Sequence, residues 1–220
     1  MKAIILVAAL AVLAGCAGKQ QKSFMSDPKF DNIQLNSVTN IWSQRVTHKL
    51  PKGWRPVYSN QNGPIFIQEF VHRKETKDNW TGMFSVTGMK GLAKQRSAKN
   101  VAFAYTRALK TLCRDDGIFV DLGEKNVGDY PGYELITGCA KSPKNLPIGL
   151  KKGKSELIYT HVVKGDQDIY VFQKSLRGDA FNKGVPPVNK ENLNAFLEGV
   201  FPLSLCRRNS SNADNCQVLN

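Results

Sequence analysis

The chain has 220 residues, of which 31 are Lys or Arg and 18 are Asp or Glu, and its formal net charge is +13 at pH 7. This length suits a single domain preceded by a short N-terminal segment. Beyond one apolar stretch at the N-terminus, no run approaches the about 20 apolar residues of a membrane-spanning helix, which excludes a polytopic membrane protein.

The first 15 residues have the pattern of an export signal. One positive charge, at Lys2, precedes a stretch of 12 almost entirely apolar residues, and small residues follow before Cys16. The stretch is too short to serve as a convincing membrane-spanning anchor. We therefore predict a signal peptide over residues 1–15.

The residues Leu13-Ala14-Gly15-Cys16 resemble the lipobox of bacterial lipoproteins. The resemblance implies that the signal is cut before Cys16 and that this cysteine carries the acyl chains, palmitate among them, that anchor the protein to the membrane. The alternative is an ordinary secretory signal with a chance cysteine at its end. Ala17 stands where an Asp would resemble the signal for retention in the inner membrane. The expected location is therefore the outer membrane, facing the periplasm.

The other four cysteines form an even set in a chain that we expect to be exported, which is typical of two disulfides. Three pairings are possible. We favour Cys113–Cys139 and Cys206–Cys216 because each joins neighbouring segments. No C-x-x-C motif occurs and no histidine lies at zinc-ligand spacing from a cysteine, so no metal site is predicted.

The composition along the chain predicts a polar, lipidated tether over residues 16–39, a globular domain over 40–205, and a polar, disulfide-held tail over 206–220. Within the domain, alternating apolar residues and turn residues predict strands. These strands are expected at 41–50, 64–73, 79–88 and 132–140, with a hairpin at 155–176.

Two helices are predicted. The first is capped by Ser97 and runs to Cys113, and Gly117 is available for a left-handed turn after it. The second begins at Asn189 and stops before Pro202. The expected buried residues are Val101, Ala104, Tyr105, Ala108 and Leu112 in the first helix, and Leu193, Phe196, Leu197 and Val200 in the second.

This order of elements predicts an α+β fold, with one antiparallel sheet packed by two main helices in a single domain with two disulfides. The order is loosely similar to that of the PsbP-like fold over roughly residues 50–205, without a diagnostic motif. The resemblance implies a similar arrangement of sheet and helices, and a shared fold does not imply a shared function.

No reaction is identified by the sequence. In "GLKKGKS" (149–155) three residues separate the two glycines where a phosphate-binding loop needs four, so we interpret it as a basic loop. The histidines at 48, 72 and 161 lie far apart, and His161 is interpreted as a packed core residue. Carboxylates such as Glu134 are assigned to solvated strand faces. No cofactor is expected.

The leading hypothesis is therefore a non-enzymatic lipoprotein, anchored to the membrane by its N-terminal lipid, that binds an envelope protein or an anionic envelope component. It could be accessory to an envelope or secretion assembly. Nucleic acid is not an expected partner, because the basic residues are not interleaved with aromatic ones. Two alternatives stay open, a hydrolase of cell-wall or lipid substrates and a carrier of a small apolar ligand. The candidate basic contact surface consists of Lys90, Lys94, Arg96, Lys99, Lys151, Lys152 and Lys154.

Overall fold

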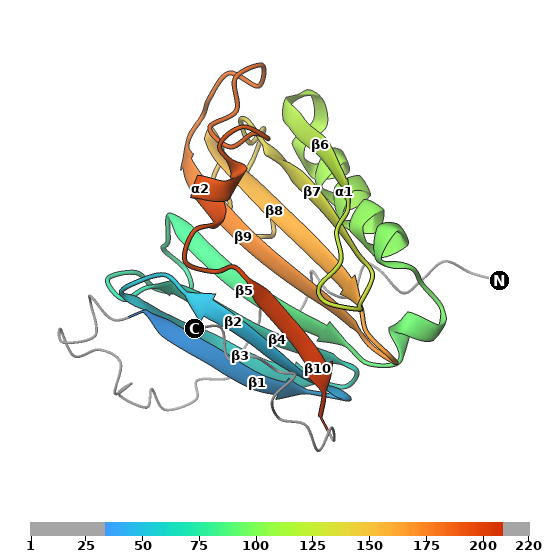
Figure 1. The fold of residues 1–220 in the computed structure, drawn as a ribbon. Helices are drawn as coiled ribbons and strands as arrows, with labels where there is room; N and C mark the ends of the chain where they lie inside the picture. The colour runs from blue at the N-terminus through green and yellow to red at the C-terminus, as the bar shows by residue number, and fades with distance from the viewer. Residues whose placement is uncertain (1–33, 209–220) are drawn as a thin grey trace.

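The computed structural model describes residues 34–208, which form two antiparallel sheets and two α-helices (Figure 1). A small sheet has the strand order β1-β2-β10, and a large sheet has the order β3-β4-β5-β9-β8-β7-β6. The strands are β1 (Leu35–Ile41), β2 (Gln44–Leu50), β3 (Trp54–Asn62), β4 (Ile65–His72), β5 (Gly82–Met89), β6 (Gly117–Glu124), β7 (Gly132–Cys139), β8 (Lys154–Lys164), β9 (Ile169–Asp179) and β10 (Leu203–Arg207). The helices are α1 (Ala98–Cys113) and α2 (Leu193–Leu197).

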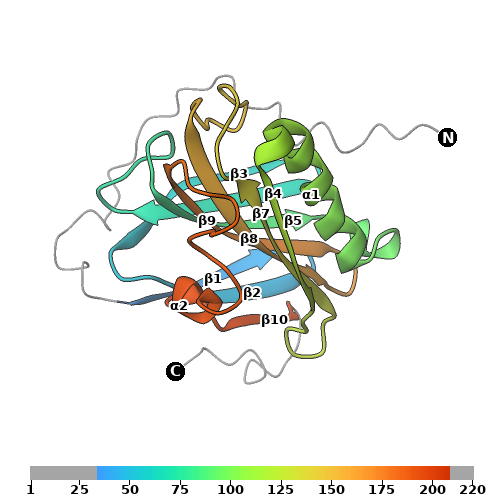
Figure 2. The same cartoon turned by 90° about the horizontal axis from the view of Figure 1, so that it is seen from above.

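The large sheet is the middle layer of the fold (Figure 2). On one face, α1 covers β6, β7 and β8, where residues such as Val101 and Ala102 pack against Leu135 and Val162. On the other face, the small sheet packs over β4, β5 and β9. Beside the small sheet, the segment that contains α2 covers β7 and β8. The two sides of β8 thus belong to different cores, which explains why this strand is apolar on both faces.

Helix α1 forms where its cap and its pattern predict it. The Ser97 side chain accepts a hydrogen bond from the Asn100 backbone N–H at 3.2 Å. The buried face is turned relative to the expected stripe, because it is centred on Leu109 and leaves Leu112 only half-buried. The left-handed residue after the helix is Arg114, with φ of 54°, whereas Gly117 is extended and begins β6.

The prediction of two main helices is wrong. The second predicted helix contains only the five residues of α2, and the rest of that segment is turn and loop. Asn192 at the start of α2 donates through its side-chain amide to the Pro187 carbonyl oxygen, and Gly199 beyond it has φ of 82°. Glu198 directly after α2 has ψ of 137°, so the chain leaves the helical path there, before Gly199. The α+β assignment and the expectation of one antiparallel sheet are wrong as well, because ten strands in two sheets and one long helix make the described chain largely β.

Two disulfides were predicted, and the described residues contain one, the expected Cys113–Cys139 bond. Cys206 lies on β10, and Cys216 lies outside the described residues, so the Cys206–Cys216 pair stays a prediction. The signal peptide and the lipidation site at Cys16 lie outside them too.

Predicted strands at β4, β5, β7 and the β8–β9 hairpin are confirmed. The segment 41–50 is instead the end of β1, a turn at Trp42 and Ser43, and β2. Strand β1 begins at Leu35, inside the segment interpreted as tether. Within residues 34–208 there is no helix that combines the length and the apolar character needed to cross a bilayer.

Candidate ligand-binding cleft

A cleft of about 490 Å³ lies beneath α2, on the face of the large sheet opposite α1. Its volume falls within the range of about 300–1,000 Å³ that is typical of ligand sites. Apolar side chains and charged groups share its wall. The lining residues are Lys125, Glu134, Leu193, Asn194, Ala195, Leu197, Glu198, Gly199 and Phe201.

Glu134 is the lining residue that the fold positions most firmly. It lies on β7 directly opposite His161 of β8, and Tyr159 lies two residues before His161 on the same strand. The Tyr159 hydroxyl donates to Glu134 Oε1 at 2.5 Å, and His161 Nδ1 lies 3.5 Å from the same oxygen. Side-chain exposure is 14% for Glu134 and 2% for His161, so the carboxylate reaches the cleft while the imidazole lies behind it.

The contact of His161 Nε2 determines the tautomer of the ring. Nε2 lies 2.9 Å from the Lys125 carbonyl oxygen, which can only accept, so Nε2 carries the proton and donates. Burial lowers the pKa of His161 and favours the neutral ring, although the Glu134 carboxylate opposes this shift. Nδ1 then has no hydrogen-bond partner among the described residues. The ring is held on its other side by Phe201, which is stacked on it at 6.3 Å between centroids.

Tyr159 keeps its proton across the physiological pH range, because burial and then the Glu134 carboxylate raise its pKa. It therefore acts as a fixed donor to Glu134. A charge-assisted bond of this kind holds the carboxylate in one orientation at the edge of the cleft.

The prediction that His161 is a core residue is confirmed, since it is 1% exposed. The assignment of Glu134 to a solvated face is wrong, because that face of β7 is covered by the segment around α2. The sequence did contain one signal. Glu134 and Ile136 are two residues apart on one strand, so their side chains share a face, and Ile136 is buried. The partner of Glu134, His161, could not be assigned before the β7–β8 register was known.

A second, smaller cavity of about 280 Å³ lies where β8 and β9 meet the loop that follows β9. Leu157, Leu176, Phe181 and Pro187 give it a mostly apolar wall. Arg177, which also lines it, is engaged on the opposite face of the sheet. Its guanidinium pairs with Glu156 at 2.9 Å and lies 3.9 Å above the Trp80 ring.

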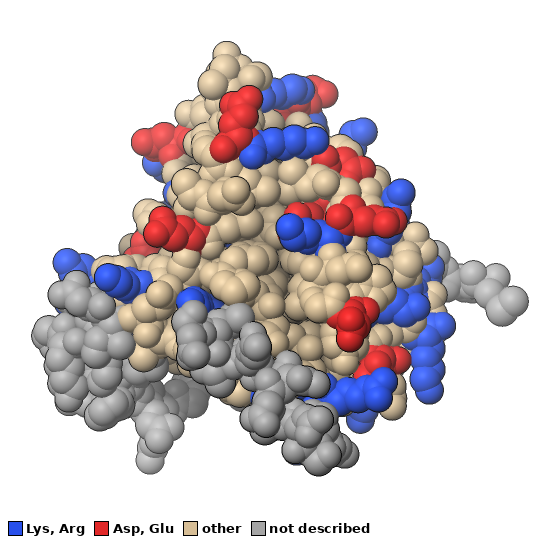
Figure 3. Space-filling model, in the orientation of Figure 1, with Lys and Arg blue, Asp and Glu red and all other residues tan. Residues whose placement is uncertain are grey.

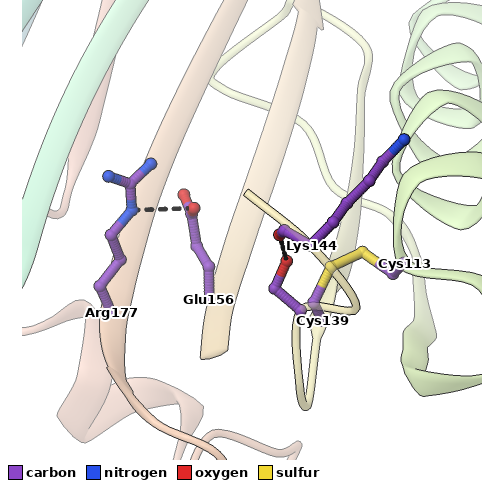
Figure 4. The surroundings of a disulfide bond; sticks show 6 residues. Cys113, Cys139, Lys144, Glu156 and Arg177 are labelled. Atoms are coloured by element: carbon purple, nitrogen blue, oxygen red, sulfur yellow. Dashed lines mark hydrogen bonds and ion pairs between the residues drawn. A yellow bond between two sulfur atoms is a disulfide. The ribbon is translucent and has the colours of Figure 1, made fainter. Parts of the chain in front are cut away.

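The disulfide joins α1 to the large sheet (Figure 4), and neither cysteine lines the cleft. Cys113 ends α1 and Cys139 ends β7, so the bond fastens the helix to the sheet. Leu109, Leu146 and Leu150 bury it. Both cysteines are 1% exposed.

The seven residues of the predicted basic surface are all exposed, but they form two groups. Lys90, Lys94, Arg96 and Lys99 follow β5 and lead into α1, whereas Lys151, Lys152 and Lys154 lie at the start of β8. Lys90 follows Met89, which pairs with Ile169 at the start of β9, and Ile169 lies opposite Lys164 at the end of β8. The two groups are therefore separated by the length of β8, about 33 Å. Lys154 is paired with Asp179 at 2.6 Å.

The described residues contain no group of three or more His, Cys, Asp or Glu side chains that could hold a metal ion. Of the site residues that the sequence predicts, the structure brings Cys113 and Cys139 together, and it separates the two basic groups.

No family model and no curated protein sequence matches this chain. Several solved structures do. LpqN of Mycobacterium tuberculosis, described as involved in cell envelope biogenesis, is 13% identical with a TM-score of 0.44, over 80% of this chain and 92% of LpqN. The Ran-binding protein Mog1p of Saccharomyces cerevisiae is 12% identical with a TM-score of 0.38, over 77% and 86% of the two chains. The cyanobacterial PsbP of Synechocystis is 14% identical with a TM-score of 0.37, over 63% and 82%. At these identities and TM-scores the likeness implies no function.

Proposed function

We propose that the protein is a lipid-anchored, non-enzymatic binding protein of the bacterial envelope that holds a ligand in the cleft beneath α2. The lipobox-like sequence that ends at Cys16 supports the anchor, and Ala17 supports the outer membrane as its location. The disulfide between Cys113 and Cys139 supports an oxidising compartment such as the periplasm.

The observation that carries the binding proposal is the composition of the cleft wall. Leu193, Leu197 and Phe201 supply apolar surface, and Glu134 supplies one oriented carboxylate. Ligand sites typically combine a mostly apolar wall with a few fixed polar groups, which determine the orientation of the ligand.

The state of His161 favours binding over catalysis. A general base must come within hydrogen-bond reach of the proton that it removes. The His161 side chain is 2% exposed, and its Nε2 is engaged by the Lys125 carbonyl. In this proposal His161 packs behind Glu134, and its Nδ1 makes no hydrogen bond among the described residues.

A matched pair of substitutions tests occupancy of the cleft. Ala195 lines the cleft and Ala180 lies outside it, and both are exposed. The wild type, Ala195→Trp and Ala180→Trp are purified from membranes, and co-purifying molecules are identified by mass spectrometry. We expect a component that is retained by the wild type and Ala180→Trp and lost from Ala195→Trp. Equal recovery from all three proteins would contradict the proposal.

A hydrolase is the second candidate, because the structure brings His161 and Glu134 together beside a cleft that also contains Glu198. Paired carboxylates can support glycan cleavage. Release of soluble fragments from purified cell wall by the wild type, but not by Glu134→Gln, would favour this candidate over the binding protein.

A further inference from the structure

The outer side of α1 carries a row of cations. Every charged residue within Ala98–Cys113 is positive, and Arg114 follows directly. At 100° per residue, Lys99, Arg107 and Lys110 fall within one stripe about 80° wide. These three residues and Arg114 at the helix end are exposed. Lys and Arg side chains, with some Asp and Glu among them, follow the right-hand edge of the molecule, where α1 and the segment that leads into it lie (Figures 1 and 3).

This stripe joins the two basic groups that the sheet separates. Lys94 and Arg96 lie just before the helix. At the other end, the loop that carries Lys151 and Lys152 packs on Leu109 of α1 through its own leucines. We call the combined surface the α1 ridge. It consists of Lys94, Arg96, Lys99, Arg107, Lys110, Arg114, Lys151 and Lys152.

The charges of the α1 ridge are not neutralised locally. No ion pair joins a ridge side chain to an acid within residues 34–208. The nearby carboxylate of Asp121 is engaged by the Tyr133 hydroxyl at 2.8 Å. Asp115 and Asp116 follow at the helix end. The cations outnumber these acids and are available to an anionic partner.

An exposed aromatic side chain lies beside the ridge. Phe119 of β6 is 46% exposed and packs against Phe103 of α1 at 5.7 Å between centroids. Phe103 lies within the cationic stripe, one turn after Lys99, whose ammonium lies 6.0 Å from its ring. Basic residues beside an exposed aromatic side chain are typical of surfaces that lie in the interface of an anionic membrane.

We propose that the α1 ridge and Phe119 bind an anionic phospholipid surface, as a membrane contact separate from the N-terminal lipid. The ridge supplies the charge complementarity, because each Lys or Arg near such a surface strengthens binding by about fivefold. Phe119 supplies apolar surface that can enter the headgroup region. The cleft lies on the opposite face of the large sheet, so the α1 ridge and the cleft can be occupied together.

Vesicle flotation tests this contact without the lipid anchor. The processed chain, which begins at position 16 with Cys16→Ser and lacks the apolar residues 1–15, is mixed with vesicles of phosphatidylglycerol and phosphatidylcholine, or with vesicles of phosphatidylcholine alone. We expect binding only to the vesicles that contain phosphatidylglycerol. It should disappear between about 0.1 and 1 M salt, where the Debye length falls from about 10 to 3 Å.

Two charge-matched triple variants locate the contact. Lys99→Gln/Arg107→Gln/Lys110→Gln removes three ridge cations and should weaken binding by about 100-fold. Lys52→Gln/Lys74→Gln/Lys190→Gln removes three exposed cations elsewhere and should change binding by less than about threefold. Phe119→Ala should cost about 5-fold to 20-fold, since it removes most of a Phe side chain from the interface.

Four outcomes would overturn the proposal. They are equal losses in the two triple variants, equal binding to both kinds of vesicle, binding that persists at about 1 M salt, and binding to DNA or an anionic polysaccharide but not to the vesicles. Because the assay omits the lipid anchor and does not involve the cleft, these outcomes leave the proposed function standing.

Discussion

Acid should destabilise the protein through His48. This residue lies on β2, is 1% exposed, and has its ring 5.2 Å from Phe70 and 4.8 Å from Phe84. Nδ1 lies 2.9 Å from the Lys49 carbonyl oxygen and therefore carries the proton. Nε2 is buried without a partner among the described residues, so a second proton would be a buried, unsatisfied donor.

Burial lowers the pKa of His48 from 6.5 to about 4 in the folded chain. The unfolded chain binds a proton as the pH falls through 6.5, whereas the folded chain does so only near 4. The unfolded state is therefore favoured progressively across this window. By linkage, the free energy of unfolding should fall by about 2 kcal/mol between pH 7 and pH 4.5 from this residue alone.

Urea denaturation at both pH values measures this effect, and His48→Leu isolates it. The pKa values of Glu69 and Glu156 are raised by burial, so these residues act in the opposite direction in both proteins. Only the difference between the proteins reports His48. We expect the wild type to lose about 2 kcal/mol more than His48→Leu on acidification. An identical pH dependence in the two proteins would refute the reasoning.

Three further variants test the contacts that hold the cleft wall and the fold. Gly132→Ala should lower the free energy of unfolding by about 1–3 kcal/mol, because a methyl group there would overlap the backbone and imidazole atoms behind the cleft. Gly178→Ala, with open space around its Cα, is the control, and equal thermal shifts in the two variants would contradict the packing argument. Tyr159→Phe should lower the free energy of unfolding, measured by urea denaturation, by about 1.5–3 kcal/mol, because the Glu134 carboxylate loses a charge-assisted hydrogen bond. A decrease below about 0.5 kcal/mol would show that this bond does not hold the carboxylate in place. Replacing both cysteines of the Cys113–Cys139 disulfide by Ala should cost about 3.5 kcal/mol by the loop-entropy model, and an unchanged melting temperature would be the contrary result.

The elements that the sequence predicts well are those with strong local signals. Helix α1 has a side-chain cap and a sustained helical period, and the β8–β9 hairpin has alternation on both sides of a turn. Two strands that the sequence does not predict, β3 and β10, lack such signals. Strand β3 contains Pro56 beside a bulge and ends in the polar residues Ser59–Asn62, which also favour a turn. Strand β10 lies beside β2, more than 150 residues away in sequence, so its partner cannot be inferred locally.

The cleft depends on tertiary structure in the same way. Glu134 and His161 become neighbours only through the register of β7 and β8, and Phe201 reaches His161 from the far end of the chain. Their residue types are visible in the sequence, but their proximity is not. The basic residues show a similar limit, because two clusters in the sequence are one surface only when α1 is seen to lie between them.

In-cell photo-crosslinking tests the central claim, that the cleft beneath α2 binds an envelope component. A benzophenone side chain is placed at Asn194, which is exposed and lines the cleft, and in a second strain at Asn60, which is exposed on β3 away from the cleft. Irradiation should give a covalent adduct at Asn194 that is absent at Asn60 and is suppressed by Ala195→Trp. The account would be contradicted by the same adduct at both positions, or by no adduct at Asn194.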